Sequence, residues 1–252
     1  SVSVVMSVYN KKIYLEKSIQ SILAQSFKKF DFIIINDCSS DTDIQTILLK
    51  FKKKDLRIKL LKNDKRLGLA SSLNKVIKFY KYDLFFRMDG DDYAHKDRLK
   101  KQMNFMIKNP HVDISGCNAF LINNKNKIIG KTNLPLNDKD IKKKIMYSNP
   151  IIHPTVCFRK KIFLKKFFYN KNFKKCQDLE LWMRLSSKKV VFQNLKSNLL
   201  YYRINKFVEF STLTYDFRAA LKHYFFSKFF FVPFVRLFKN ILSMIIKLKN
   251  IF

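Results

Sequence analysis

Hydrophobic residues in the first 110 positions occur in short continuous runs that alternate with stretches of helical spacing. The apolar runs, which predict buried strands, lie at 3–8, 30–35, 58–61 and 84–88. Helices are expected between and after these runs, at 14–23, 42–52, 70–80 and 99–106. Asn10 is expected to cap the first helix. Regular alternation of strands and helices predicts βαβ crossovers and therefore an α/β fold with a mostly parallel, Rossmann-like sheet.

The second half of the chain has a less regular pattern. Strands are expected at 112–122 and 155–158, with a short strand at 127–130 pairing with the first of these. Helices are expected at 137–146 and 176–185, and two closing strands at 190–192 and 199–202. We therefore divide the chain into a main domain at 1–205, made of halves at 1–110 and 111–205, and a tail at 206–252.

Polar side chains follow the second and fourth strands. The segment from Asn36 to Asp41 follows one strand, and Asp89, Asp91 and Asp92 surround Gly90 after the other. Ligands of open α/β sheets bind outside the carboxyl ends of the strands. Carboxylates this close repel one another unless a cation lies between them, and oxygen ligands suit Mg²⁺ or Mn²⁺. The pattern predicts a metal–diphosphate site; the alternative is a solvated acidic turn that ends a strand.

Composition narrows the choice of partners. The 252 residues are 47% hydrophobic, which is enough for a core, and 51 Lys and Arg residues against 19 Asp and Glu residues give a formal charge of +32. This excess predicts an anionic partner such as a nucleotide, a nucleic acid or an acidic membrane surface. The lysines are spread over every expected helix, so charge alone does not choose between these partners.

The tail combines basic and aromatic residues. No acidic residue occurs from 217 to 252, and no apolar run approaches the ~20 residues that span a bilayer. We expect two short basic amphipathic helices in the headgroup layer of an anionic membrane; packing on the main domain or on a partner is the alternative. Widely spaced cysteines and the absence of a visible leader predict a reducing cytoplasm.

Several motifs together resemble the inverting GT-A glycosyltransferases of family 2, of the bacterial exopolysaccharide and lipopolysaccharide side-chain type. The resemblance covers roughly 1–205 and rests on Ser7-Val8-Tyr9-Asn10, Asn36-Asp37-Cys38-Ser39-Ser40-Asp41, Gly68 with Leu73-Asn74, Asp89-Gly90-Asp91-Asp92 with Arg98-Leu99 and Gln102, Gln177-Asp178 before Leu181-Trp182-Met183-Arg184-Leu185, and Tyr202-Arg203. Departures from the family pattern are Val8 where proline is frequent, Asn36 where an acid is common, Cys38 where glycine is usual and Gln177 where glutamate is frequent.

The resemblance implies a role for each matching residue. The nucleotide-sugar would be bound by Val8, Tyr9, Asn10, Asp37, Gly68, Asp89 and Gly90, with Asp37 on the uracil of a UDP-sugar. Asp91 would ligate Mn²⁺ or Mg²⁺, Asp178 would be the general base, and the acceptor side would include His153, Gln177 and Trp182. Structural readings stand beside these roles: Asp37 could cap a helix, Asp178 could be only a first-turn acid, His153 could support a loop, Trp182 could be core, and Arg98 could form a salt bridge.

The implied activity is metal-dependent transfer of one sugar from a UDP-sugar to a hydroxyl of a lipid-linked or polysaccharide acceptor. It would take place in the cytoplasm, on the inner face of the plasma membrane. The alternatives are a nucleic-acid-binding α/β protein and a sugar nucleotidyltransferase. Neither is favoured, because no basic groove is apparent and Tyr9-Asn10-Lys11-Lys12 carries no glycine-rich loop.

Overall fold

The computed structural model describes residues 1–10, 12–204, 210–224 and 229–249. Its strands are β1 (Val2–Val8), β2 (Asp31–Asn36), β3 (Ile58–Lys62), β4 (Leu84–Met88), β5 (Tyr93–Ala94), β6 (Ile114–Ile122), β7 (Ile128–Lys131), β8 (Cys157–Arg159) and β9 (Phe192–Arg203). Its helices are α1 (Leu15–Leu23), α2 (Thr42–Lys54), α3 (Leu69–Phe79), α4 (Arg98–Lys108), α5 (Asp138–Ile145), the 3₁₀ turn η1 (His153–Thr155), α6 (Lys161–Leu164), α7 (Gln177–Ser186), α8 (Phe210–Tyr224) and α9 (Val232–Lys249). The expected domain boundary at 205/206 lies outside the described residues.

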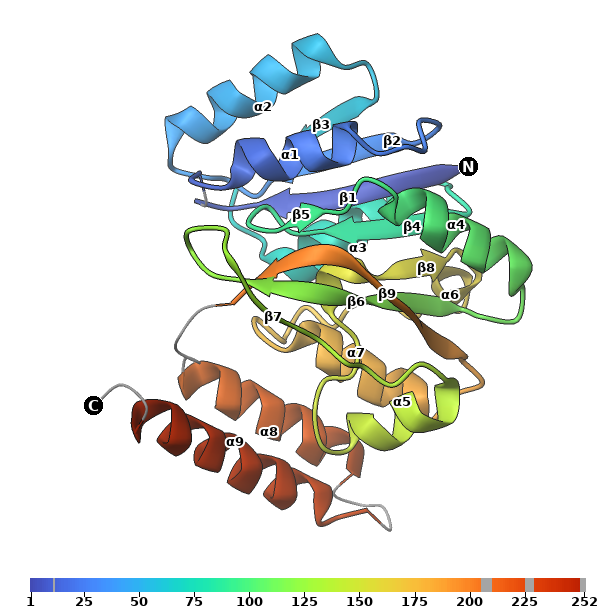
Figure 1. Ribbon diagram of the computed structural model, residues 1–252, viewed down its shortest axis with the longest axis vertical. Helices are drawn as coiled ribbons and strands as arrows, with labels where there is room; N and C mark the ends of the chain where they lie inside the picture. The colour runs from blue at the N-terminus through green and yellow to red at the C-terminus, as the bar shows by residue number, and fades with distance from the viewer. Residues whose placement is uncertain (11, 205–209, 225–228, 250–252) are drawn as a thin grey trace.

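All the described strands belong to one sheet, in the order β3-β2-β1-β4-β8-β6-β9-β5, with β7 on β6 (Figure 1). The strands β3, β2, β1 and β4 are parallel, as the sequence pattern predicts. The second half is mixed, because β8 pairs antiparallel with both β4 and β6 whereas β9 runs parallel to β6. The carboxyl ends of β1, β2 and β4 therefore meet at one edge of the sheet.

Helices cover both faces of this sheet. Alternate side chains of β1 point to opposite faces, so Val4 and Met6 pack with α1, α2 and α4, whereas Val5 packs with α3 and α7. Both faces of the central strands are buried, which explains why these strands appear in the sequence as continuous apolar runs.

Several details differ from the sequence predictions, which did not include β5 or α6. The prediction that Asn10 caps the first helix is wrong: α1 begins after Tyr14, and Asn10 lies in a turn with φ 47°. The two closing strands are one strand, β9, whose register on β6 shifts on either side of Asn118. Because Lys196 and Ser197 lie unpaired at this irregularity, their polar sequence resembles a turn between two strands.

The tail forms a helical hairpin against the main domain. Helix α8 packs on α7 and buries Leu213, Ala219 and Ala220, and α9 packs on α8 (Figure 1). Arg236 of α9 is buried, ion-paired to Asp216 of α8, and donates to the carbonyl of Ile145 at 2.7 Å. The described part of α8 thus follows the alternative reading, in which a tail helix packs on the main domain. In the part of the chain that the structure describes, no helix is both long and apolar enough to cross a membrane.

Gly116 of β6 sits where no larger residue fits. A Cβ atom there would lie 2.3 Å from Asn194 Oδ1 and 3.1 Å from Ile151 Cγ2. We expect Gly116→Ala to reduce the free energy of unfolding by about 1–3 kcal/mol, because overpacking forces the neighbours to move. Gly130→Ala is the matched control, since its Cβ would meet nothing closer than 3.6 Å. Urea unfolding measures both; equal stability of the two variants would contradict the prediction.

Candidate nucleotide-sugar site

A cleft of about 490 Å³ lies at the carboxyl ends of β1, β2 and β4. Of the residues expected to bind nucleotide, the cleft is lined by Val8, Tyr9, Asp37, Gly68, Asp89 and Gly90; Asp91 and Gln177 line it as well. Asn10 does not line the cleft, since its side chain bonds to Ser40 instead. The residues predicted from the sequence therefore make up half of the lining of this cleft, and Asn10 lies beside it through its bonds to Ser40.

Asp37 organises one wall of the cleft. Its buried carboxylate accepts hydrogen bonds from the backbone N–H of Leu67 at 2.9 Å and of Gly68 at 2.8 Å, and from Asn63 Nδ2 at 2.8 Å. It does not cap α2, because Asp41 does so by accepting from the N–H of Asp43 at 2.9 Å. Asp37 thus fixes the loop before α3, where Gly68 takes φ 84°.

Basic side chains that sequence reasoning missed stand at this cleft. The guanidinium of Arg66 lies 3.9 Å from the ring centroid of Tyr9, and Lys171 and Lys174 line the cleft as well. These cations suit an anionic ligand such as a diphosphate. Nothing in the sequence distinguished them, because 51 Lys and Arg residues are spread along the chain.

The acidic turn after β4 has the donor set of a cation site. Asp89, Asp91 and Asp92 each offer an oxygen atom, and these atoms lie within 4.8 Å of one another. Asp92 is buried; its Oδ1 accepts a hydrogen bond from the N–H of Arg203 at 2.7 Å, and its Oδ2 has no hydrogen-bond partner among the described residues. Burial, and then the neighbouring charges of Asp89 and Asp91, raise the pKa of Asp92 well above the usual range. A divalent cation would stabilise the buried charge of Asp92 and would offset the repulsion among the three carboxylates. The residues therefore fit Mg²⁺ or Mn²⁺.

Three arginines hold the acidic turn in place. Arg87, buried at the end of β4, forms an ion pair with Asp89, and the side chain of Arg203 donates to the carbonyl of Asp91 at 2.9 Å. Arg98 was expected to form a salt bridge, and the structure corrects this: its buried guanidinium donates to the carbonyl of Arg87 at 2.8 Å and to Gln102. The sequence did contain a signal for the role of Arg87, because an arginine inside the apolar run 84–88 needs a partner when the strand is buried.

A second cleft, of about 520 Å³, lies on the other side of the acidic turn. It contains Asp178 together with Asn149 and His153, and it shares Leu69, Asp89, Asp91 and Gln177 with the first cleft. The acidic turn therefore lies where the two clefts meet.

Asp178 lies in the first turn of α7, half-buried at the wall of the second cleft. Its Oδ2 accepts a hydrogen bond from Asn149 Nδ2 at 2.8 Å. Burial raises the pKa of Asp178, and the hydrogen bond from Asn149 opposes that rise without cancelling it. A carboxylate with a raised pKa in a cleft is suited to accept a proton.

The remaining acceptor-side residues divide between cleft and core. Gln177 is buried and lines both clefts. Its Oε1 has no hydrogen-bond partner in the described structure. His153 lines the second cleft and bonds through Nε2 to the hydroxyl of Tyr169 at 2.7 Å; burial lowers its pKa well below the usual range. Trp182 is fully buried against His153 and Phe158, so the expectation that it faces an acceptor is corrected: it supports His153 from the core.

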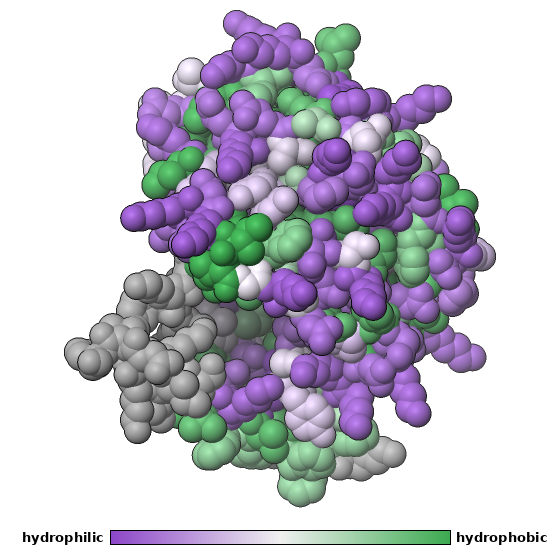
Figure 2. Space-filling model, viewed as in Figure 1, coloured by the Kyte–Doolittle hydropathy of each residue, from purple (hydrophilic) through white to green (hydrophobic). Residues whose placement is uncertain are grey.

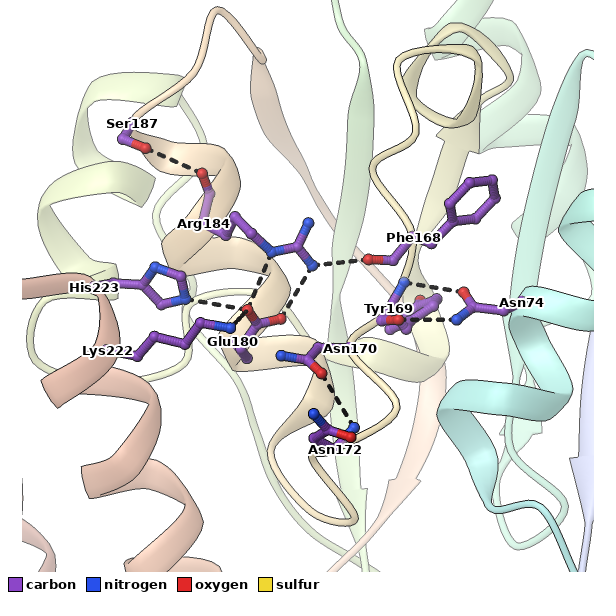
Figure 3. A network of polar contacts seen from close by, with 10 residues as sticks. All are labelled: Asn74, Phe168, Tyr169, Asn170, Asn172, Glu180, Arg184, Ser187, Lys222 and His223. Atoms are coloured by element: carbon purple, nitrogen blue, oxygen red, sulfur yellow. Dashed lines mark hydrogen bonds and ion pairs between the residues drawn. The ribbon is translucent and has the colours of Figure 1, made fainter.

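A buried acid fixes the helix that carries Asp178. Glu180 is fully buried and meets Arg184 of its own helix and Lys222 and His223 of α8 (Figure 3). Arg184 also donates to the carbonyl of Phe168 at 2.8 Å. One carboxylate thus joins α7 to the tail hairpin and to the loop around 168, and so sets the position of α7.

We expect this network to appear in the pH dependence of stability. Burial alone would disfavour the charged form, but hydrogen bonds from His223 and Arg184 outweigh it and lower the pKa of Glu180 from 4.5 to about 2. Because the folded-state pKa is the lower one, the ionised acid stabilises the fold above pH 4.5, and this contribution is lost as pH falls toward 2.

The corresponding variant is Glu180→Gln. It should lower the free energy of unfolding at pH 7 by about 3 kcal/mol, on the order of the pKa shift, and by much less near pH 3. Denaturant unfolding at both pH values measures this difference. A deficit that does not change with pH would show that the charge of Glu180 is not what stabilises the fold.

The structure has an α/β fold with an acidic turn between two clefts, and the residues of the first cleft suit an anionic ligand bound with a cation. Comparison with known proteins gives the family: the model described as Glycosyl transferase family 2 matches residues 3–168. The chain therefore belongs to glycosyl transferase family 2, and it is a glycosyltransferase with a GT-A fold.

Relatives in several organisms share most of the chain. It is 33% identical over 205 residues to a glycosyltransferase of uncharacterised function, MJ1057, of Methanocaldococcus jannaschii, covering 81% of this chain and 70% of that protein. It is also 33% identical over 218 residues to the O-antigen biosynthesis glycosyltransferase WbnJ of Escherichia coli, covering 85% of this chain and 84% of WbnJ.

Solved structures share the fold at lower identity. S. aureus TarS in complex with UDP superposes with a TM-score of 0.66 at 19% identity, over 88% of this chain and 66% of that chain. Mannosyltransferase PcManGT from Pyrobaculum calidifontis, in complex with GDP-Man and Mn²⁺, superposes with a TM-score of 0.66 at 13% identity, over 88% and 62%. This chain thus spans a little under two thirds of the length of each of these two solved chains.

Proposed function

We propose that this protein is a metal-dependent, inverting glycosyltransferase that moves a single sugar from a UDP-sugar to a hydroxyl of a lipid-linked or polysaccharide acceptor. The observation that carries the proposal is the placement of the acidic turn between two clefts, one with cations suited to a diphosphate and the other containing Asp178. The chain's similarity to an O-antigen biosynthesis glycosyltransferase supports an acceptor of the cell envelope.

In the proposed arrangement the donor occupies the first cleft. Val8 and Tyr9 flank the base, Asp37 and Gly68 form the wall against the nucleoside, and Arg66, Lys171 and Lys174 lie near the diphosphate. Asp89 and Gly90 contact the ribose or the sugar. UDP is proposed through the family resemblance. The structural neighbours include one protein in complex with UDP and another in complex with GDP-Man.

Asp91, with Asp89 and Asp92, would hold Mg²⁺ or Mn²⁺. Such a bound cation neutralises charge on the diphosphate and acts as a Lewis acid. The protein's own residues keep the three carboxylates together, since Arg87 pairs with Asp89 and Arg203 fixes both Asp91 and Asp92.

Asp178 is the proposed general base in the second cleft. It takes the proton from the acceptor hydroxyl as that oxygen bonds to the anomeric carbon, while the bond from this carbon to the diphosphate oxygen breaks. Attack from the side opposite the leaving group inverts the anomeric configuration in one displacement. Asn149 orients the carboxylate, and Gln177 and His153 lie where an acceptor sugar could bind.

The proposed acceptor is a lipid-linked saccharide, so the proposed place of action is the cytoplasmic face of the plasma membrane, with the segment 206–252 contributing membrane association. The formal charge of +32 supports attraction to anionic lipids. No nucleic acid partner is proposed, because the carboxylates of the central site would repel a phosphate backbone.

Release of nucleoside diphosphate from a panel of UDP-, GDP- and dTDP-sugars tests the function. Slow hydrolysis of the correct donor proceeds without its acceptor, so the acceptor need not be known. We expect turnover of one UDP-sugar with Mn²⁺ and none with EDTA. Turnover of a GDP- or dTDP-sugar would change the donor, and metal-independent turnover would overturn the role of the acidic turn.

A further inference from the structure

Over 232–242, where the burial of its side chains is described, helix α9 turns apolar residues outward. The buried face of this part carries Val232, Pro233 and the charged Arg236, whereas its exposed face carries large apolar residues. Residues at helical spacing form an outward stripe: Phe231, Phe234, Val235, Phe238, Ile241 and Leu242. Phe238 is 70% exposed. Figure 2 shows hydrophobic residues gathered along the lower end of the molecule, over α9, while hydrophilic residues cover much of the rest of that face.

Packing inside the protein fixes which face of α9 points outward. Arg236 is held by Asp216 of α8 and by the carbonyl of Ile145, so the helix cannot rotate to hide its phenylalanines without stranding a buried guanidinium. An exposed, contiguous apolar surface of this kind indicates an interaction site.

Lysines border this stripe. Lys239 is exposed on α9 and donates to the carbonyl of Tyr147 at 3.4 Å, just beyond the end of α5. The last turn of α5 presents exposed Lys143 and Lys144 next to this contact. No acidic residue occurs in the sequence from 217 onward. The surface therefore combines apolar side chains with a rim of lysines, although α5 also carries the exposed Asp140 one turn before Lys143 and Lys144.

We propose that the outward stripe of α9 is a docking surface for an anionic lipid bilayer, with Phe234 and Phe238 entering the acyl boundary and Lys143, Lys144 and Lys239 meeting the headgroups. A second copy of the chain is a poorer occupant, because two such faces would bring like charges together. The inference rests on the proposed function for its biological purpose, since a lipid-linked acceptor requires the enzyme at a membrane. It also divides the tail: α8 fixes the catalytic helix through Glu180, and α9 meets the lipid.

Co-sedimentation of the full chain with vesicles tests the inference. The probes are vesicles of phosphatidylcholine alone and of phosphatidylcholine with phosphatidylglycerol. We expect the wild type to bind the anionic vesicles, and Phe234→Glu/Phe238→Glu to bind them at least roughly tenfold more weakly. The matched control is Phe79→Glu/Ile107→Glu, which adds the same charge at residues 76% and 65% exposed outside the stripe and should bind nearly as the wild type does.

The outcomes separate this inference from the proposed function. Both double variants should hydrolyse a water-soluble donor at the wild-type rate, because neither touches the clefts. Equal vesicle binding by the stripe variant and the control variant would overturn the inference, as would a wild type that ignores anionic vesicles. A wild-type dimer that the stripe variant converts to monomers in size-exclusion chromatography would likewise overturn it in favour of a second copy. If the wild type hydrolyses no nucleotide-sugar donor, the proposed function is refuted, whatever the result of the vesicle experiment.

Discussion

Asp178→Asn is expected to lower kcat for release of nucleoside diphosphate by roughly 10²- to 10⁴-fold, the usual contribution of a positioned general base. The asparagine keeps the size of the side chain and its place beside Asn149, but it cannot accept a proton. Donor binding, measured by titration calorimetry with the nucleoside diphosphate, should stay near the wild-type value, because Asp178 lines the second cleft and not the first.

The pH profile adds a readout that a purely structural role would not move. The base works only when ionised, so wild-type turnover should fall as pH drops through the pKa of Asp178, which burial has raised above the usual 3.8. The variant should lack this acid limb. Asp140→Asn, which removes another first-turn helix acid at a site outside the clefts, is the control. If Asp178→Asn behaves like this control, the residue is only a helix-end acid.

Asp91→Asn is expected to abolish the stimulation of donor turnover by Mn²⁺ and to weaken metal-dependent binding of the nucleoside diphosphate. Removing one of three clustered carboxylates takes away a ligand oxygen and part of the charge that attracts the cation. The loss in turnover should be at least about 10²-fold, on the scale of removing several kcal/mol of charge stabilisation.

Binding of Mn²⁺ by itself provides a second measurement for this prediction. Paramagnetic relaxation of water protons should report tight binding to the wild type and weak binding to Asp91→Asn. Asp97→Asn changes a carboxylate in the same segment that lines neither cleft, so it should bind Mn²⁺ normally. Unchanged metal affinity in Asp91→Asn would mean that the acidic turn is not the metal site.

Sequence patterns were sufficient for the four parallel strands of the first half and the helices between them, although not for the short strand β5. Strands buried on both faces need continuous apolar residues, and helices that cover them need one apolar stripe, so both leave clear signals. The same reasoning located the polar clusters of Asp37 and of Asp89 to Asp92, because the ends of parallel strands meet at one edge. Cys38, which stands where glycine is usual in the family, adopts φ 59°, a conformation that glycine takes more readily.

Periodicity alone could not orient individual side chains of the second half. Trp182 and Asp178 lie on the same short helix, and the motif that suggested both as site residues does not say that one faces the core and the other a cleft. That difference depends on where α7 packs, which is set by contacts between Glu180 and α8, far away in sequence. Similarly, the polar residues inside β9 resembled a turn in the sequence. They belong to a strand because β9 pairs irregularly with β6 at this point, and this pairing depends on both strands.

The sequence by itself determined the α/β class, the acidic turn and the resemblance to family 2, because each depends on local spacing and on residue type. Only the tertiary structure decided that the acidic turn joins two clefts, that Asp178 lines the second, and that α9 turns its phenylalanines outward. These outcomes depend on long-range partners: Arg203 reaches back to Asp91 and Asp92, and Asp216 draws Arg236 inward. A basic helix with apolar residues on both sides has two possible buried faces, and a buried ion pair selects between them.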